Sequence, residues 1–161
     1  MKSIYAPWRM AYIKGEKVEG CVFCKESIRD DKYVLLDGKT AFVMLNAYPY
    51  TNGHLMIIPF RHLSSLEDLL PEERLEIFSL MDISVRVLKE LMSPDGFNIG
   101  INLGRAAGAG IDDHIHVHVV PRWNGDTNFM SVVGDIRVIP DDILKSCDQL
   151  KSCFNKYRRE D

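Results

Sequence analysis

The chain has 161 residues, 46% of them apolar, and a formal net charge of −3. That length suits one compact domain, which buries roughly 70% of the surface that the unfolded chain exposes. No stretch approaches the ~20 consecutive apolar residues of a membrane helix, and residues 1–16 lack the apolar core of a secretion signal, so we expect a cytoplasmic protein. Because 20 basic residues stand against 23 acidic ones without a long basic run, the composition favours a small-molecule ligand over nucleic acid.

The N-terminal part of the chain predicts an irregular arm followed by three short strands. Residues 1–30 are rich in turn formers and show no clear period. Strands are expected over 33–36 and 41–46, with a hairpin turn at Asp37-Gly38-Lys39, because Asp-Gly tolerates the positive φ that such turns need. A third strand is expected over 54–59 and ends at a proline.

A long helix and two further strands are expected next. The helix begins at Pro71 and ends near Ser93; its residues at helical spacing are Leu75, Phe78, Ser79, Asp82, Val85 and Leu88. Alternating side chains predict strands over 97–103 and 114–120, and the tail over about 141–161 is typical of a helix. This order predicts an α+β domain, with an antiparallel sheet of about five strands and one long helix packed across it.

The four cysteines fall into two groups with different meanings. Cys147 and Cys153 lie in the helical tail, where we interpret them as packed thiols. Cys21 and Cys24 form a C-x-x-C pair, which by itself is compatible with a redox pair, a metal site or coincidence.

Three of the five histidines alternate with apolar residues in one short segment. In a strand, His114, His116 and His118 share one face, and the apolar residues between them share the other. Three rings spread over ~13 Å of strand can hardly share one zinc ion. At least one ring therefore has another task, and an imidazole held in a single tautomer leaves a basic nitrogen free to attack phosphorus.

A loop of small residues precedes this segment. Residues 102–110 contain three glycines and three alanines. Side chains of that size let phosphate oxygens approach backbone N–H groups closely. The loop and the histidine face together indicate chemistry on a phosphate ester.

The segment from His114 to Val120 fits the pattern His-φ-His-φ-His-φ-φ, in which φ is apolar, at every position. The chain thereby resembles the histidine triad (HIT) family of nucleotide hydrolases and transferases. Similar segments are spread over Tyr5–Asp142, at residues 42–46, 52–54, 59–62 and 121–130. The last of them is most similar to the fragile-histidine-triad branch and to the bacterial diadenosine tetraphosphate phosphorylase-like members.

The resemblance implies a site and a reaction. His116 would attack the α-phosphorus of a dinucleoside polyphosphate and carry a transient nucleotidyl group, with His118 and His54 supporting it as catalytic residues. The implied nucleotide-binding residues are Asn46 for the ribose, Asn102 for phosphate, and the loop residues Gly108, Ala109 and Gly110.

The resemblance also implies a metal and a quaternary structure. In zinc-bearing members, the positions of Cys21, Cys24, His62 and His114 hold a structural Zn²⁺ ion, which would pin the arm over 1–30 to the active strand. Residues 1–161 would form a single HIT domain, and the family implies a homodimer that joins the two sheets.

Several functional alternatives stay open at this point. Members of the family often carry a hydroxyl or Gln near the scissile phosphate, where this chain has Gly110, so we expect water to outrun inorganic phosphate as the acceptor. Phosphorolysis of the same substrates and nucleoside phosphoramidase activity are the alternatives. A sensor that only binds nucleotides and a metallohydrolase are readings from other functional classes.

Overall fold

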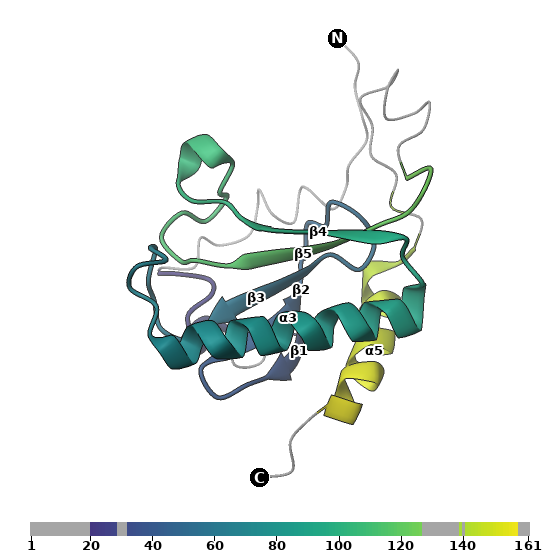
Figure 1. Cartoon of the computed structure of the whole chain (residues 1–161), viewed down its shortest axis with the longest axis horizontal. Coiled ribbons are helices and arrows are strands. Elements are labelled where there is room, and N and C mark those ends of the chain that lie inside the picture. The colour runs from purple at the N-terminus through teal and green to yellow at the C-terminus, as the bar shows by residue number, and fades with distance from the viewer. Residues whose placement is uncertain (1–19, 29–31, 127–138, 140, 158–161) are drawn as a thin grey trace.

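The computed structural model describes residues 20–28, 32–126, 139 and 141–157 (Figure 1). Of the arm predicted over 1–30, residues 1–19, 29 and 30 lie outside the described residues, as does the family segment beyond residue 126. The elements in chain order are α2 (Lys25–Ile28), β1 (Val34–Asp37), β2 (Ala41–Leu45), β3 (Leu55–Pro59), α3 (Pro71–Met92), β4 (Gly96–Ile101), the 3₁₀ turn η1 (Arg105–Ala107), β5 (Val117–Arg122), α5 (Ile143–Phe154) and the 3₁₀ turn η2 (Asn155–Tyr157).

The strands form one antiparallel sheet in the order β1-β2-β3-β5-β4. Helix α3 runs across one face of this sheet, and α5 packs against α3 and β1 (Figure 1). The predicted α+β architecture with one long helix across the sheet is therefore confirmed. Within the described residues, no helix has the length and apolar character needed to cross a membrane.

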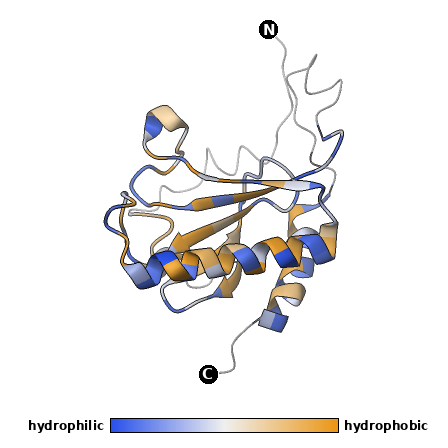
Figure 2. Ribbon diagram, viewed as in Figure 1, coloured by the Kyte–Doolittle hydropathy of each residue, from blue (hydrophilic) through white to orange (hydrophobic). Residues whose placement is uncertain are grey.

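Apolar side chains cover both faces of the sheet, and the ribbon of β3 is coloured as hydrophobic in Figure 2. Every residue of β2 and β3 is buried, and alternate residues belong to two clusters. Val43 and Ile57 join the larger cluster under the helices, whereas Met44 and Met56 join a smaller one on the opposite face. Because Met56 is the register partner of His118, the histidines lie on the face of the smaller cluster.

Helix α3 has the predicted length, but of the residues that its spacing singled out only Leu88 is buried. The exposed fractions of Leu75 and Phe78 are 72% and 69%. The buried positions are Glu73, Ile77, Leu80, Ser84, Val87 and Leu88. The helix carries apolar residues on two sides, as Figure 2 shows by its alternating colours, so periodicity alone does not identify the side that faces the sheet.

Two local predictions differ from the structure. Strand β5 begins at Val117, not His114, because Ile115 N–H bonds the carbonyl of Leu63 in a loop and not a neighbouring strand. The β1–β2 hairpin forms, but the φ angle of Gly38 is not positive. Glycine is needed there for space, since a Cβ atom would lie 2.7 Å from Glu76 Oε1 and from the carbonyl oxygen of Ala41.

Candidate active site and metal centre

The structure brings four of the five histidines into one row on the face opposite α3. His54, His114, His116 and His118 have exposed fractions of 0, 1, 6 and 8%. The ring centroids of His116 and His118 lie 4.8 Å apart, and those of His54 and His118 lie 5.1 Å apart. Strand β5 and the residues before it supply three rings, and the start of β3 supplies His54.

A backbone carbonyl fixes the tautomer of His116. Its Nδ1 lies 2.9 Å from the carbonyl oxygen of His114, which only accepts hydrogen bonds. The ring hydrogen therefore resides on Nδ1. The other nitrogen, Nε2, keeps its lone pair, which is the property that a nucleophile needs.

A second chain of hydrogen bonds fixes His54 and His118. The backbone N–H of Tyr50 donates to His54 Nδ1 over 3.1 Å, so the hydrogen of His54 is on Nε2. That Nε2–H donates to His118 Nδ1 over 2.9 Å, which places the hydrogen of His118 on Nε2. His118 thus presents an N–H group, and not a lone pair, toward the side-chain amide of Asn102 at 3.4 Å.

The asparagine amides lie at the two ends of this chain. Asn46 Nδ2 is 3.3 Å from His54 Nδ1, and Asn46 Oδ1 accepts the backbone N–H of Tyr48 over 2.9 Å. The N–H of His118 needs an acceptor, so the side-chain amide of Asn102 turns its oxygen, and not its NH₂ group, toward the ring. Its NH₂ group is then directed away from the ring.

Burial favours the neutral forms of His118 and His114. Desolvation, assisted by the neighbouring His116, lowers the pKa of His118 to about 4. Desolvation also lowers the pKa of His114. At neutral pH both rings therefore carry one hydrogen, as the hydrogen-bond chain requires.

The predicted metal ligands also meet in space. The ligand atoms of Cys21, Cys24, His62 and His114 all lie within 4.8 Å of one another. His114 Nε2 donates to the carbonyl of Pro59 over 2.9 Å, so its Nδ1 is bare and lies 3.2 Å from Cys21 Sγ. Two thiols and two imidazoles are a donor set that Zn²⁺ accepts, and a carbonyl that holds the remote ring nitrogen is a common outer partner of such a ligand. The residues present therefore fit a metal ion.

An ion pair anchors the loop that carries His62. The Nε and Nη2 atoms of Arg61 donate to the two carboxylate oxygens of Glu73 over 2.7 and 2.8 Å. The same carboxylate accepts the backbone N–H of Leu70 over 2.8 Å at the start of α3. The Arg61 bond lowers the pKa of Glu73, so the pair stays charged at neutral pH. His62 is thereby held next to a fixed point of the helix.

The small-residue loop curls beyond the end of β4 around η1 (Figure 1). Gly104 and Gly108 have φ angles of 76° and 88°, in the region that favours glycine. Arg105 and Asp112 close the loop with a 2.8 Å ion pair. Gly110 is exposed, has no positive φ, and a Cβ atom there would meet nothing within 4 Å. The structure thus places Gly108, Ala109 and Gly110 in an open loop that leads into the histidine segment.

Two aromatic residues of the site were missed at the sequence level. The ring of Tyr50 packs on those of His54 and His118, at centroid distances of 4.5 and 5.7 Å. The ring of Phe23 packs edge-on against His116 and His114, at 5.1 and 5.9 Å. Both lie in turns, where no periodic pattern reports which way a side chain points. Their closeness in sequence to His54 and to the cysteine pair was the only available signal.

The other two cysteines take no part in this site. Cys147 and Cys153 are buried on α5, and the thiol of Cys147 donates to the carbonyl of Lys32 over 3.2 Å. The prediction of packed thiols is confirmed.

Comparison with known proteins identifies the family of this chain. The HIT domain model matches residues 28–125. The chain belongs to the histidine triad family. An AP-4-A phosphorylase of Mycobacterium tuberculosis is 46% identical over 69% of this chain, which spans 57% of that relative's length. An asymmetrical bis(5'-nucleosyl)-tetraphosphatase of Schizosaccharomyces pombe is 34% identical over 55% of the chain and 48% of its own length.

A solved structure supports the same assignment. The crystal structure of a zinc-bound histidine triad family protein from Mycobacterium smegmatis has a TM-score of 0.68 and 32% identity. The alignment covers 85% of this chain and 94% of that one. The predicted family and HIT-like fold are therefore confirmed, and the Cys2His2 cluster occurs in a family with a zinc-bound member.

Proposed function

We propose that this HIT protein cleaves dinucleoside polyphosphates of the diadenosine tetraphosphate type at the α-phosphorus through a covalent nucleotidyl-His116 intermediate. The observation that carries the proposal is the bare Nε2 of His116, whose tautomer is set by the carbonyl of His114. The similarity to a phosphorylase and to a tetraphosphatase that both act on such compounds supports the substrate class.

In the first step, Nε2 of His116 forms a bond to the α-phosphorus, and the bond from phosphorus to the bridging oxygen breaks. The positive charge that develops on the imidazole lies beside the carbonyl oxygen of His114, 2.9 Å from Nδ1. His118 is neutral, and its Nε2–H would leave the Asn102 amide to donate to a phosphate oxygen without giving up the proton. The leaving nucleotide is a stable anion at neutral pH and needs no general acid.

In the second step, we infer that inorganic phosphate is the preferred acceptor. Water needs a base to take its proton, and within the described residues His118 offers an N–H group where a base would need a lone pair. A phosphate dianion attacks without losing a proton, and the amide of Asn102 and the loop N–H groups are the donors available to hold it. The 46% identity to a phosphorylase favours this alternative over the water acceptor that Gly110 predicted.

The proposed products distinguish the two acceptors. Attack by phosphate converts diadenosine tetraphosphate into ADP and ATP, whereas attack by water gives AMP and ATP. With ¹⁸O-labelled phosphate at millimolar concentration, mass spectrometry should find the label in ADP. A predominance of AMP under these conditions would show that water is the acceptor.

The role of His116 has its own test. His116→Asn should reduce turnover by several orders of magnitude and leave nucleotide affinity nearly unchanged, because only the covalent step is lost. The parent should release its first leaving group in a burst upon rapid mixing. A binding-only sensor would show neither a burst nor turnover, and activity of the variant within tenfold of the parent would exclude His116 as the nucleophile.

We further propose that the metal cluster holds a structural Zn²⁺ ion and that the protein is a homodimer. A closed set of two cysteines and two histidines leaves no position for substrate, so the ion would fix the cysteine turn at residues 21–24 of the arm to the histidine segment. The dimer proposal rests on β4, which among the described strands pairs with β5 alone and leaves its outer edge without a partner from them.

A further inference from the structure

Phe23 connects the metal cluster to the proposed nucleophile. It lies between the two cysteines of the C-x-x-C turn, and its backbone N–H points at Cys21 Sγ over 3.4 Å. Its side chain is 6% exposed and belongs to the apolar cluster that contains Met44 and Met56. From that anchored position its ring meets His116 at a centroid distance of 5.1 Å and an interplanar angle of 61°.

The hydrogen bond of His116 does not fix its ring completely. A single bond from Nδ1 to the carbonyl of His114 sets the direction of the N–H group but lets the ring tilt about the N···O line. Two ring contacts oppose that tilt: Phe23 at 61° and His118 at 76°, with centroids 5.1 and 4.8 Å away. Because the attacking Nε2 lies on the far side of the ring, a tilt of the imidazole displaces it from the line of attack.

We propose that Phe23 is a positioning residue for His116, which holds the imidazole in its attacking orientation. This inference rests on the proposed nucleophilic role of His116. The contact requires a flat ring edge, since edge-to-face packing of two rings fixes an angle that an aliphatic side chain of similar volume does not. It also makes the cysteine turn part of the site's geometry, beyond any effect on stability.

The test compares Phe23→Leu with Phe60→Leu. Phe23→Leu removes a ring from the apolar cluster, and Phe60→Leu removes a partly buried ring that packs against the same cluster. The ring of Phe60 stacks on Phe42 at a centroid distance of 5.4 Å. For Phe23→Leu we expect kcat to fall about tenfold with KM within about twofold of the parent, because misplacement of a reacting atom slows chemistry more than binding. For Phe60→Leu, kcat should stay within about twofold.

Two readouts do not depend on turnover. Metal content, measured by mass spectrometry, should be the same in both variants and the parent. The ¹⁵N-detected ring signals of His116 should broaden or split in Phe23→Leu only, since the ring then samples several tilts. Phe23→Met, which also lacks a flat ring, should repeat both effects if Phe23→Leu proves poorly folded.

Several results would overturn the inference. An unchanged kcat with unchanged His116 signals would show that the ring contact does not position the nucleophile. A change in KM alone would make Phe23 a substrate contact, and a loss of kcat reversed by added metal would make its effect structural. If His116→Asn stays active, the proposed function fails, yet the ring signals still report whether Phe23 orients His116.

Discussion

At the scale of single residues, the site depends on which nitrogen of each histidine carries the hydrogen. The sequence predicts the shared face of His116 and His118, because alternation fixes it. It does not predict the tautomers, since these depend on a carbonyl at His114 and an N–H at Tyr50 that become partners only in the folded chain. The roles of the site residues in binding and catalysis stay predictions.

The buried neutral state of His118 predicts its behaviour with pH. Its folded pKa of about 4 lies below the value of ~6.5 of an unfolded histidine, so the unfolded chain binds more protons between these values. The contribution of His118 to stability is therefore complete above pH 6.5 and is lost as the pH falls toward 4. In an NMR titration, the His118 ring signals should not shift above pH 5. A midpoint near 6.5 would contradict the buried neutral ring.

Substitutions at Gly110 test whether water or phosphate is the preferred acceptor. Because a side chain at this position meets open space and no positive φ forbids it, Gly110→Ser and Gly110→Ala should both fold as the parent does. If the backbone and Asn102 already hold phosphate, the ratio of ADP to AMP should change by less than about twofold in either variant. A rise in ADP with serine but not alanine would restore the earlier expectation that a missing hydroxyl disfavours phosphate.

At the scale of elements, the hydrophobic pattern predicts most strands and the long helix to within three residues. It fails where a loop replaces a strand partner, as at His114–His116, and where a helix is apolar on two sides, as at Leu75 and Phe78. For the cysteine turn at Cys21 and Cys24, no hydrophobic pattern indicates a role. Only the resemblance to the family predicts that it binds metal. The structure brings its side chains to His62 and His114, which are far away in sequence.

The cysteine turn predicts a linked loss of metal and stability. Cys21→Ser removes a thiolate ligand, so bound zinc should fall well below one ion per chain and the melting temperature should drop by several degrees. Cys153→Ser is the matched control, because that thiol is buried on α5 and is not part of the cluster. Elemental analysis with thermal unfolding decides, and a parent protein purified without any zinc would contradict the proposed metal.

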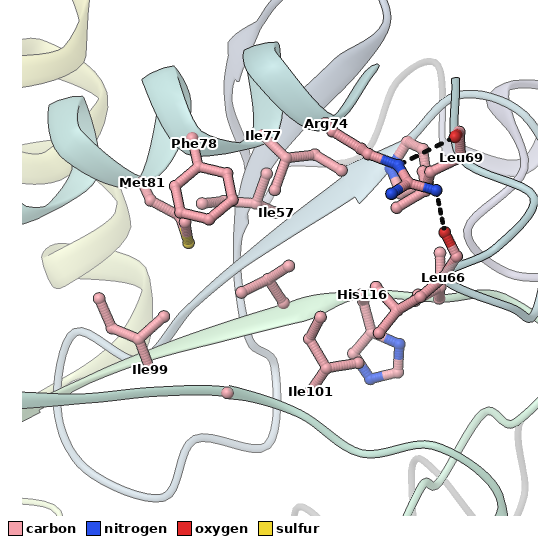
Figure 3. A pocket seen from close by; sticks show the side chains of 14 residues that line it. Ile57, Leu66, Leu69, Arg74, Ile77, Phe78, Met81, Ile99, Ile101 and His116 are labelled. Atoms are coloured by element: carbon pink, nitrogen blue, oxygen red, sulfur yellow. Dashed lines mark hydrogen bonds between the residues drawn. The ribbon is translucent and has the colours of Figure 1, made fainter. Parts of the chain in front are cut away.

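At the scale of the whole molecule, the surface formed by α3 and β4 exposes large apolar side chains. A cavity of about 450 Å³ opens between α3 and strands β3, β4 and β5 (Figure 3). Ile77, Phe78 and Met81 line it from the helix, and Ile99 and Ile101 line it from β4. Arg74 closes one end by donating to the carbonyls of Leu66 and Leu69 over 3.0 Å each.

This surface continues onto the outer edge of β4, which pairs with no other strand in the part of the chain that the structure describes. Ile99 is 46% exposed there, and Phe78, which lines the cavity from α3, is 69% exposed. In the proposed dimer, a second copy related by a two-fold axis would bring an identical apolar helix and an identical strand edge to these surfaces. The exposed positions Leu75 and Phe78, which the helical spacing singled out, fit this proposed contact.

The dimer is tested by placing charge on this surface. Phe78→Glu should shift the protein from twice the mass of the chain to the monomer at micromolar concentration in analytical ultracentrifugation, because a carboxylate cannot be buried against a second apolar helix without a partner. Leu144→Glu is the matched control, since Leu144 is 45% exposed on α5 and does not line the cavity. Dissociation by Leu144→Glu alone would place the interface on α5. A parent protein that is monomeric at about 100 μM would refute the dimer, because that concentration is far above the Kd of an interface of standard size.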